Sequence, residues 1–269
     1  HVRHPMSPAS GDLGGRPLGN DFSGQDGFNM YYGHTVPGFP SHPHRGFETV
    51  TFVRKGFIDH SDSVGARARY GAGDVQWLTA GAGVQHAEMF PLLDSDKPNE
   101  QELFQIWLNL PARSKFVEPA FKMLWAEDLP VHRAGGAQVT VLAGAFTPPE
   151  GGAALVPPSP APDSWASDPR SDLAIWVVRL APGAAITLPP AANGRSLRTL
   201  FLFLGDGLRI EGLDIGGNKR VEVDASQPLP LANGGADEVQ LMLMQGVPLG
   251  EPVAAGGPFV MNTQEELHQ

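Results

Sequence analysis

The chain has 269 residues, which is enough for one large or two medium-sized domains. Nineteen basic and 29 acidic residues give a formal net charge of -10, which opposes docking on a nucleic-acid backbone or an anionic membrane. Because the sequence contains no cysteine, disulfides, thiolate catalysis and sulfur-ligated metals are excluded, and His, Asp, Glu or water would have to hold any metal. Apolar residues make up 41%, with 33 glycines and 26 prolines, which indicates a folded protein with many turns.

The sequence predicts a soluble cytoplasmic protein. Its longest apolar runs, such as Leu200–Leu204, are far shorter than the ~18–20 residues that a membrane-spanning helix needs. The first residue is His rather than Met, so a leader removed from the natural protein is compatible with the sequence.

Most of the chain has the pattern of short strands. Residues 1–20 are rich in Gly, Pro and Ser and predict a flexible N-terminal arm. From about Asn29 onward, β-forming runs alternate with Gly, Pro or Asn turns, and helical periodicity is nearly absent, which predicts an all-β sandwich or barrel. The expected strands are Phe47–Val53, Asp74–Thr79, Val84–Phe90, Leu103–Leu110, Gln138–Ala143, Ile175–Leu180, Ala185–Leu188, Leu197–Leu204, Arg220–Asp224 and Val239–Gln245.

A weak internal repeat suggests two barrels. Residues 197–224 follow the same order of strands and Gly turns as residues 47–75, so two related β-barrels in tandem are expected. We place the N-terminal barrel in residues 1–132 and the C-terminal barrel in residues 133–269.

Two further segments are expected outside the strands. The proline-rich stretch from Thr147 to Pro169 predicts a surface excursion or linker. Near the C-terminus, Thr263 and Glu266 have the spacing of a capping box, which predicts the start of a helix.

The histidines are concentrated in the first barrel. Five of the nine lie between residues 34 and 86, whereas residues 133–267 contain none. The second barrel is therefore predicted to be a degenerate, structural barrel without metal ligands. His34 and His60 are isolated beside turn residues, and we expect surface or hydrogen-bonding roles for them.

Two pairs of residues share the spacing that a metal site on strands requires. His42 and His44 are two residues apart, and so are His86 and Glu88. On a strand such residues point to one face, about 6.6 Å apart, so two strands can close four ligands around one ion. Pro43 places the first pair on an edge strand or at a strand entry. Three imidazoles and one carboxylate suit Fe(II), Mn(II), Ni(II), Cu(II) or Zn(II), with positions open for a substrate and dioxygen.

The same residues carry a resemblance to a known family. The segment HPHRGFETVTF, which begins at His42, resembles the first motif of the cupin superfamily. The segment from Gly73 to Met89 resembles the second cupin motif in the form found in pirins, and residues 105–119 and 251–266 are also similar to pirin sequences. This resemblance implies two tandem cupin barrels (double-stranded β-helices, or jelly rolls).

The resemblance also implies a ligand set. It places a single metal, usually Fe(II), in the N-terminal barrel, held by His42, His44, His86 and Glu88. General cupins use a glutamate of the first motif, here Glu48, in place of Glu88. Four residues beyond His44 on an extended strand is about 13 Å, too far unless the chain bends after His44, so we assign Glu88 as the ligand. Glu48 is left as a partner of the ligands.

The resemblance gives two readings of the function. Bacterial pirins are associated with quercetin 2,3-dioxygenase activity, which implies a metal-dependent dioxygenase that cleaves a flavonol-like aromatic or another enolisable substrate with O2. In that reaction Glu88 would be the catalytic base for the substrate's hydroxyl proton. The vertebrate relative is described as an iron-dependent transcriptional co-regulator, which implies a redox-responsive protein acting through protein partners without turnover. A scaffold that retains the site without using it is a third reading.

Overall fold

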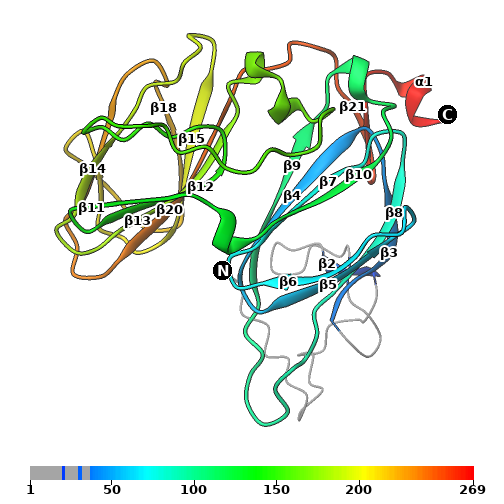
Figure 1. Cartoon of the computed structure of the whole chain (residues 1–269), viewed down its shortest axis with the longest axis horizontal. Coiled ribbons are helices and arrows are strands. Elements are labelled where there is room, and N and C mark those ends of the chain that lie inside the picture. The colour runs from blue at the N-terminus through cyan, green and yellow to red at the C-terminus, as the bar shows by residue number, and fades with distance from the viewer. Residues whose placement is uncertain (1–19, 22–29, 32–36) are drawn as a thin grey trace. The chain divides into compact units, whose positions relative to one another are not determined.

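The computed structural model describes residues 20–21, 30–31 and 37–269, and this part of the chain is nearly all β (Figure 1). Residues 1–19 of the expected arm lie outside the described residues, and so does His34. Within the described part the one α-helix is α1 (Gln264–Leu267), and no helix there is long and apolar enough to cross a membrane.

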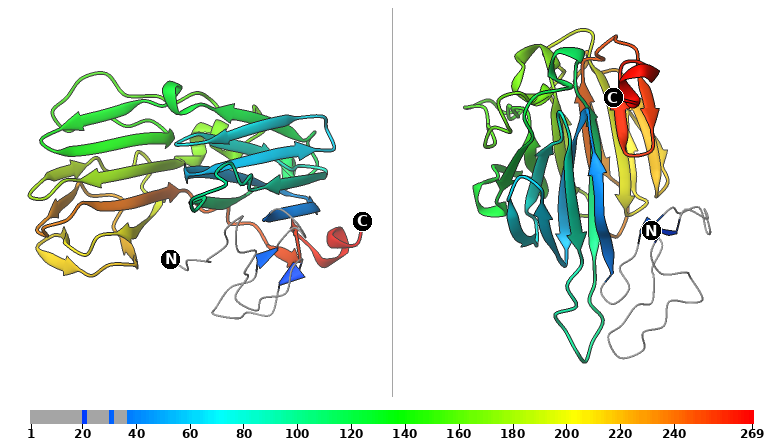
Figure 2. Two further views of the ribbon diagram at one scale, coloured as in Figure 1. Left: turned by 90° about the horizontal axis from the view of Figure 1, so that it is seen from below. Right: turned by 90° about the vertical axis from the view of Figure 1, so that its right-hand side faces the viewer.

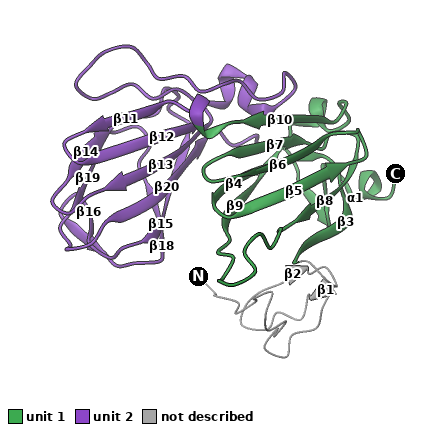
Figure 3. Cartoon of the chain, turned by 60° about the horizontal axis from the view of Figure 1, so that its bottom comes forward, with its two compact units in different colours: residues 1–126, 251–269 green, residues 127–250 purple. Residues whose placement is uncertain are grey.

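The chain forms two compact units, which Figure 3 shows in different colours. The first unit combines residues 1–126 with residues 251–269, and the second consists of residues 127–250. The first unit thus ends at residue 126 rather than 132, and the C-terminal tail belongs to it rather than to the second barrel as expected. The reason is that the tail pairs with residues of the first unit. Phe259 forms a bridge with Arg45, the Val260 amide donates to the Arg45 carbonyl oxygen, and the Val260 carbonyl oxygen accepts from Lys115.

The first unit is built from two four-stranded antiparallel sheets. One sheet has the order β3 (Gly38–His44), β8 (Val84–Met89), β5 (Phe57–Asp62) and β6 (Arg67–Gly71). The other has the order β10 (Ala120–Leu124), β7 (Val75–Thr79), β4 (Phe47–Lys55) and β9 (Glu102–Asn109). Two small two-stranded sheets complete it: β1 (Asn20–Asp21) pairs with β2 (Met30–Tyr31), and β21 (Ala254–Gly256) pairs with β22 (Phe259–Met261). The first unit also contains the 3-10 turn η2 (Ala112–Ser114), and the 3-10 turn η3 (Ala126–Asp128) spans the boundary between the two units in the sequence.

The second unit has a six-stranded and a four-stranded antiparallel sheet, seen from two further sides in Figure 2. The larger sheet has the order β11 (Val131–Ala134), β12 (Ala137–Ala143), β13 (Ala174–Leu180), β20 (Val239–Gly246), β15 (Leu197–Leu204) and β18 (Lys219–Val223). The smaller has the order β14 (Ala185–Leu188), β19 (Leu229–Asn233), β16 (Leu208–Ile210) and β17 (Leu213–Ile215). Between them lies an aliphatic core that includes Val178, Leu200 and Leu241.

All ten strands expected from the sequence are present, with ends within two residues of the expected ones. Residues 47–75 and 197–224 do form corresponding strands. In the first unit β4 pairs with β7 and β5 pairs with β6. In the second unit β15 pairs with β18 and β16 pairs with β17 in the same way. The all-β class and the tandem repeat are therefore confirmed.

The two segments outside the strands are also as expected. Residues 147–169 form no strand, although Trp165 is buried and lies in the 3-10 turn η4 (Trp165–Ser167), which is followed by η5 (Pro169–Ser171). The capping box is present at α1: the Glu266 amide donates to Thr263 Oγ1, and the Thr263 amide donates to the Glu266 carboxylate.

Lys115 ties three segments of the first unit together. Its side chain is buried, and Nζ donates to the carbonyl oxygens of Gly46 and Val260, both at 2.8 Å, and to Asn109 Oδ1 at 2.5 Å. Burial lowers the pKa of Lys115 to about 8, so the ammonium form still dominates at neutral pH.

We expect Lys115→Met to destabilise the protein by about 2–4 kcal/mol, because three buried or half-buried acceptors lose their donor. Chemical denaturation measures this, with Lys219→Met as the control, since Lys219 is exposed on β18. Equal stability of the two variants would contradict the role of Lys115.

Candidate metal centre

Strands β3 and β8 place three histidines together inside the first unit. In the register of the two strands, His42 lies directly opposite His86, after an irregularity between Phe39 and His42. His42 Nε2 lies 3.1 Å from His44 Nε2 and 3.0 Å from His86 Nε2. Strand β3 is an edge strand of its sheet, as Pro43 predicted.

Two backbone carbonyl oxygens determine which ring nitrogen of His42 and of His44 carries the hydrogen. His42 Nδ1 lies 2.8 Å from the carbonyl oxygen of Pro40, and His44 Nδ1 lies 3.4 Å from that of Pro258. A carbonyl oxygen only accepts hydrogen bonds, so each Nδ1 carries the hydrogen, and Nε2 of each neutral ring has the lone pair that can bind a metal. The two Nε2 atoms, which are both acceptors in this tautomer, lie 3.1 Å apart, and a cation bound by both would offset the repulsion between their lone pairs. The donor set therefore fits a metal ion.

Burial keeps the three imidazoles neutral. It lowers the pKa of His42, and together with the neighbouring histidines it lowers the pKa of His44 to about 4 and that of His86 to about 2. Nδ1 of His86 has no hydrogen-bond partner among the described residues. Neutral imidazole is the form that binds metals.

Glu88 extends the group on the same face of β8. Its carboxylate is buried and accepts hydrogen bonds from Gln105 Nε2 at 3.0 Å and from the Tyr70 hydroxyl at 3.4 Å. Burial raises the pKa of Glu88 to about 7, although both hydrogen bonds favour the charged form. The ligand atoms of Glu88, His86 and His60 lie within 4.8 Å of one another, as do those of the three histidines, so His86 belongs to both groups.

His60 was expected to have a surface or hydrogen-bonding role, and the structure buries it near the proposed ligands. It is buried on β5 opposite Glu88, so a surface role is wrong and the hydrogen-bonding role is correct. Nε2 lies 2.9 Å from Asp62 Oδ2 and Nδ1 lies 3.0 Å from Gln76 Nε2, so both ring nitrogens are engaged. Burial lowers the pKa of His60 against the opposing effect of Asp62. The spacing of His60 and Asp62, again two residues, was the signal that could have found it.

Glu48 lies on the other face of its strand. The chain does bend at Gly46, whose φ is 80°, but β4 then directs Glu48 away from the face that carries Thr51. The Glu48 carboxylate accepts hydrogen bonds from Trp77 Nε1 at 2.9 Å and from Thr79 Oγ1 at 2.7 Å. Thr51 lies opposite Gln76 and Gln105, which are the side chains that reach His60 and Glu88. Of the two carboxylates, Glu88 is therefore the one on the histidine side.

An aromatic edge borders the histidines. The ring of Trp107 lies 5.6 Å from that of His44 and 4.5 Å from that of Phe47, and half of the Trp107 side chain is exposed. An exposed indole next to buried imidazoles offers a flat apolar surface to a ligand at the site.

The corresponding strands of the second unit carry no such group. Their buried positions are the polar Asn233 and the aliphatic Ile186, Leu188, Leu229 and Leu231. Among the residues that the structure describes, all groups of three ligand-type side chains lie in the first unit.

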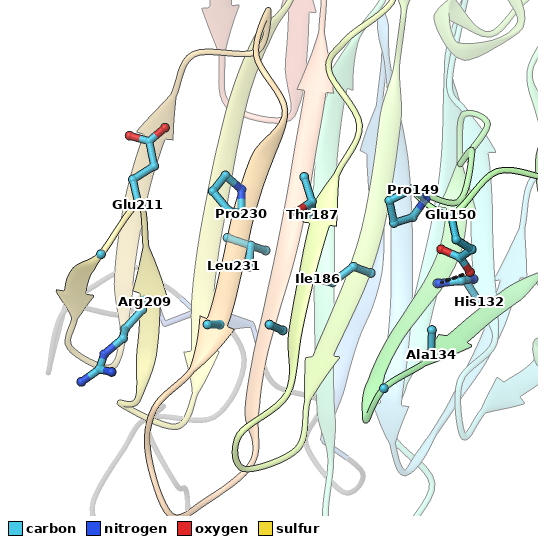
Figure 4. A pocket seen from close by; sticks show the side chains of 14 residues that line it. His132, Ala134, Pro149, Glu150, Ile186, Thr187, Arg209, Glu211, Pro230 and Leu231 are labelled. Carbon is cyan, nitrogen blue, oxygen red and sulfur yellow. Dashed lines mark ion pairs between the residues drawn. The ribbon is translucent and has the colours of Figure 1, made fainter.

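A cavity of about 550 Å³ does lie in the second unit, and Figure 4 shows its lining. At one end His132 Nε2 lies 3.5 Å from Glu150 Oε1, and at the other end are Arg209 and Glu211. One histidine and one carboxylate are too few to hold a metal ion at this end.

Comparisons with known proteins identify the family. A sequence model of the pirin family matches residues 9–108, and a model of the pirin C-terminal cupin domain matches residues 175–269. A Pseudomonas aeruginosa protein named "Putative quercetin 2,3-dioxygenase" is 35% identical over 238 residues, which cover 87% of this chain and 77% of that protein. The human protein named pirin is 33% identical over 251 residues, covering 90% of this chain and 78% of that one.

A solved structure agrees with these relatives. The crystal structure of a quercetin 2,3-dioxygenase from Acinetobacter baumannii superposes with a TM-score of 0.71 and 29% identity, covering 90% of this chain and 78% of that one. The two β units, with a histidine and glutamate cluster that could bind a metal in the first, define a cupin protein with two tandem cupin domains. The chain belongs to the pirin family.

Proposed function

We propose that the protein is a metal-dependent dioxygenase of the quercetin 2,3-dioxygenase type, which cleaves a flavonol or a similar enolisable substrate with O2. The observation that carries the proposal is the convergence of three imidazole Nε2 atoms, with those of His44 and His86 at 3.1 and 3.0 Å from that of His42, beside the buried carboxyl group of Glu88. The names of the bacterial relatives and of the Acinetobacter structure support this activity.

The ligands proposed for the metal are His42, His44, His86 and Glu88, and the metal proposed is Fe(II). Mn, Ni, Cu and Zn remain alternatives, because imidazole and carboxylate ligands without sulfur accept each of these ions. When bound, the metal would supply a Lewis-acid centre at which substrate and O2 are held together.

Glu88 is proposed to take the proton of the substrate's hydroxyl group. Burial raises the pKa of Glu88 to about 7 in the metal-free protein, and a bound cation would favour the charged carboxylate, which is the form that accepts a proton. Gln105 and Tyr70 hold the two carboxylate oxygens from different strands and so fix the direction in which the group can accept. His60 does not touch the substrate in this proposal but holds Gln76 at the back of the site.

Trp107 is proposed to bind the flat ring system of the substrate. Its half-exposed indole lies against Phe47 and beside His44, so an aromatic ligand stacked there would lie next to the histidines.

The proposal predicts oxygen uptake with release of carbon monoxide when the protein, loaded with Fe(II) under anaerobic conditions, is mixed with a flavonol and air. Gas analysis and an oxygen electrode measure both, and His86→Ala is expected to reduce both to background. A fully metal-loaded protein that releases no carbon monoxide would sink the dioxygenase proposal. Metal-dependent capture of a protein partner in that case would favour the regulatory alternative.

A further inference from the structure

The C-terminal hairpin of β21 and β22 lies directly beside the histidines of β3, although more than 200 residues separate them in sequence. Phe259 forms a parallel bridge with Arg45, and the Val260 amide donates to the Arg45 carbonyl oxygen at 3.0 Å. The first residue of this bridge immediately follows His44. The hairpin therefore pairs with the segment that directly follows His44.

Several independent contacts hold the hairpin in this position. Lys115 Nζ bridges the carbonyl oxygens of Val260 and Gly46. The Arg45 guanidinium lies 5.6 Å from the centre of the Phe259 ring and donates to the carbonyl oxygen of Glu266. Met261 is completely buried. With this many contacts, the tail has a defined place in the first unit.

One contact reaches a proposed ligand. His44 Nδ1 lies 3.4 Å from the Pro258 carbonyl oxygen, in the turn between β21 and β22. His42 has the same kind of partner, but its carbonyl, from Pro40, is local, whereas that of His44 comes from the tail. A partner on the far nitrogen of a histidine selects its tautomer and its direction, and so controls its strength as a ligand.

We propose that the C-terminal hairpin is a positioning element of the metal centre: the Pro258 carbonyl oxygen holds His44 as the Nδ1–H tautomer with Nε2 directed at the metal. The inference rests on the metal site proposed above. Because coupling between two binding events is reciprocal, bound metal also strengthens docking of the hairpin. The tail thereby connects occupancy of the site with the order of the C-terminus.

The test uses the full chain with point variants that release or spare the hairpin. Met261→Asp introduces a carboxylate at a buried position and is expected to undock the hairpin, and Lys115→Met removes one anchor. Val253→Asp is the matched control, because it introduces the same residue, Asp, into the same tail, but at a position where the side chain is 62% exposed.

Three readouts separate positioning from general stability. Nitrogen-15 NMR of histidine-labelled, metal-free protein reports the tautomer of His44, hydrogen exchange of the Val260 amide reports docking, and competition with a chelator gives the affinity for Ni(II). In Met261→Asp we expect faster exchange at Val260, a mixture of His44 tautomers and at least about tenfold weaker Ni(II) binding. Lys115→Met should change all three in the same direction but less, and Val253→Asp should match the wild type. In the wild type, Ni(II) should slow exchange at Val260.

The proposal is overturned if Met261→Asp undocks the hairpin while His44 keeps the Nδ1–H tautomer and Ni(II) affinity stays within about twofold of wild type. Failure of the proposed metal site would look different, because the wild type itself would then bind no Ni(II). The tautomer comparison in metal-free protein would still decide whether the hairpin positions His44.

Discussion

Substitution of His86 by Ala is expected to abolish metal binding. His86 is the histidine shared by both ligand groups, and its Nε2 lies 3.0 Å from that of His42. Loss of a partner of a ligand typically weakens metal binding by ~10–100-fold, and loss of a ligand should exceed this. Elemental analysis of protein loaded with Fe(II) and dialysed should show about one equivalent in the wild type and almost none in the variant.

The same substitution should remove the stabilisation that metal gives to the fold. At 100 times its dissociation constant, a ligand stabilises the native state by about 2.7 kcal/mol, which for a chain of this size raises Tm by several degrees. Thermal unfolding with and without metal measures this shift, which His86→Ala should lose. His132→Ala is the control, because His132 lies in the second unit. One equivalent of metal retained by His86→Ala would refute the proposed site.

The two buried glutamates should respond in opposite ways to substitution. Glu88→Gln keeps the shape of the side chain but removes its charge and replaces one acceptor oxygen by an NH2 group, which can donate to the Tyr70 hydroxyl while that hydroxyl donates to Gln76. Metal affinity should therefore fall by about tenfold or more while metal-free stability stays nearly unchanged. Glu48→Ala leaves the buried donors of Trp77 and Thr79 without their acceptor, and should lower the free energy of unfolding by about 2–4 kcal/mol.

Metal titration and chemical denaturation of both variants decide between the two carboxylates. Glu48→Ala should retain one metal equivalent wherever it is folded, and Glu88→Gln should retain the wild-type denaturation midpoint without metal. The reverse pattern would assign the ligand role to Glu48, as in general cupins, and exclude Glu88.

The sequence predicted the parts of the structure that depend on local periodicity. The strands Ala185–Leu188 and Leu197–Leu204 were expected with the bounds they have, because their buried residues alternate with exposed ones or form apolar runs between turns. The spacing of His42 and His44 likewise predicted an inward-facing pair on an edge strand, and the structure places them so.

What depends on contacts between distant strands could not be predicted in this way. The internal repeat implied a strand at β5, but its charged and polar residues resemble a turn, so its bounds were not expected and the buried position of His60 was missed. The orientation of Glu48 depends on which face of β4 follows the bend at Gly46. The tail was assigned to the second barrel because chain order gives no sign that residues 251–269 return to the first.

The chain contains the same strand arrangement twice, once lined by histidines and carboxylates and once by Ile186, Leu188, Leu229 and Leu231. In the second copy, aliphatic side chains fill the corresponding positions of β14 and β19, so this architecture closes and packs without imidazoles or carboxylates there. Folding alone therefore does not explain why the other copy contains buried imidazoles and a buried carboxyl group, that of Glu88, whose pKa is raised to about 7. Among the described residues, the free-energy cost of burying a cluster of ligand-type side chains therefore falls on the first copy alone.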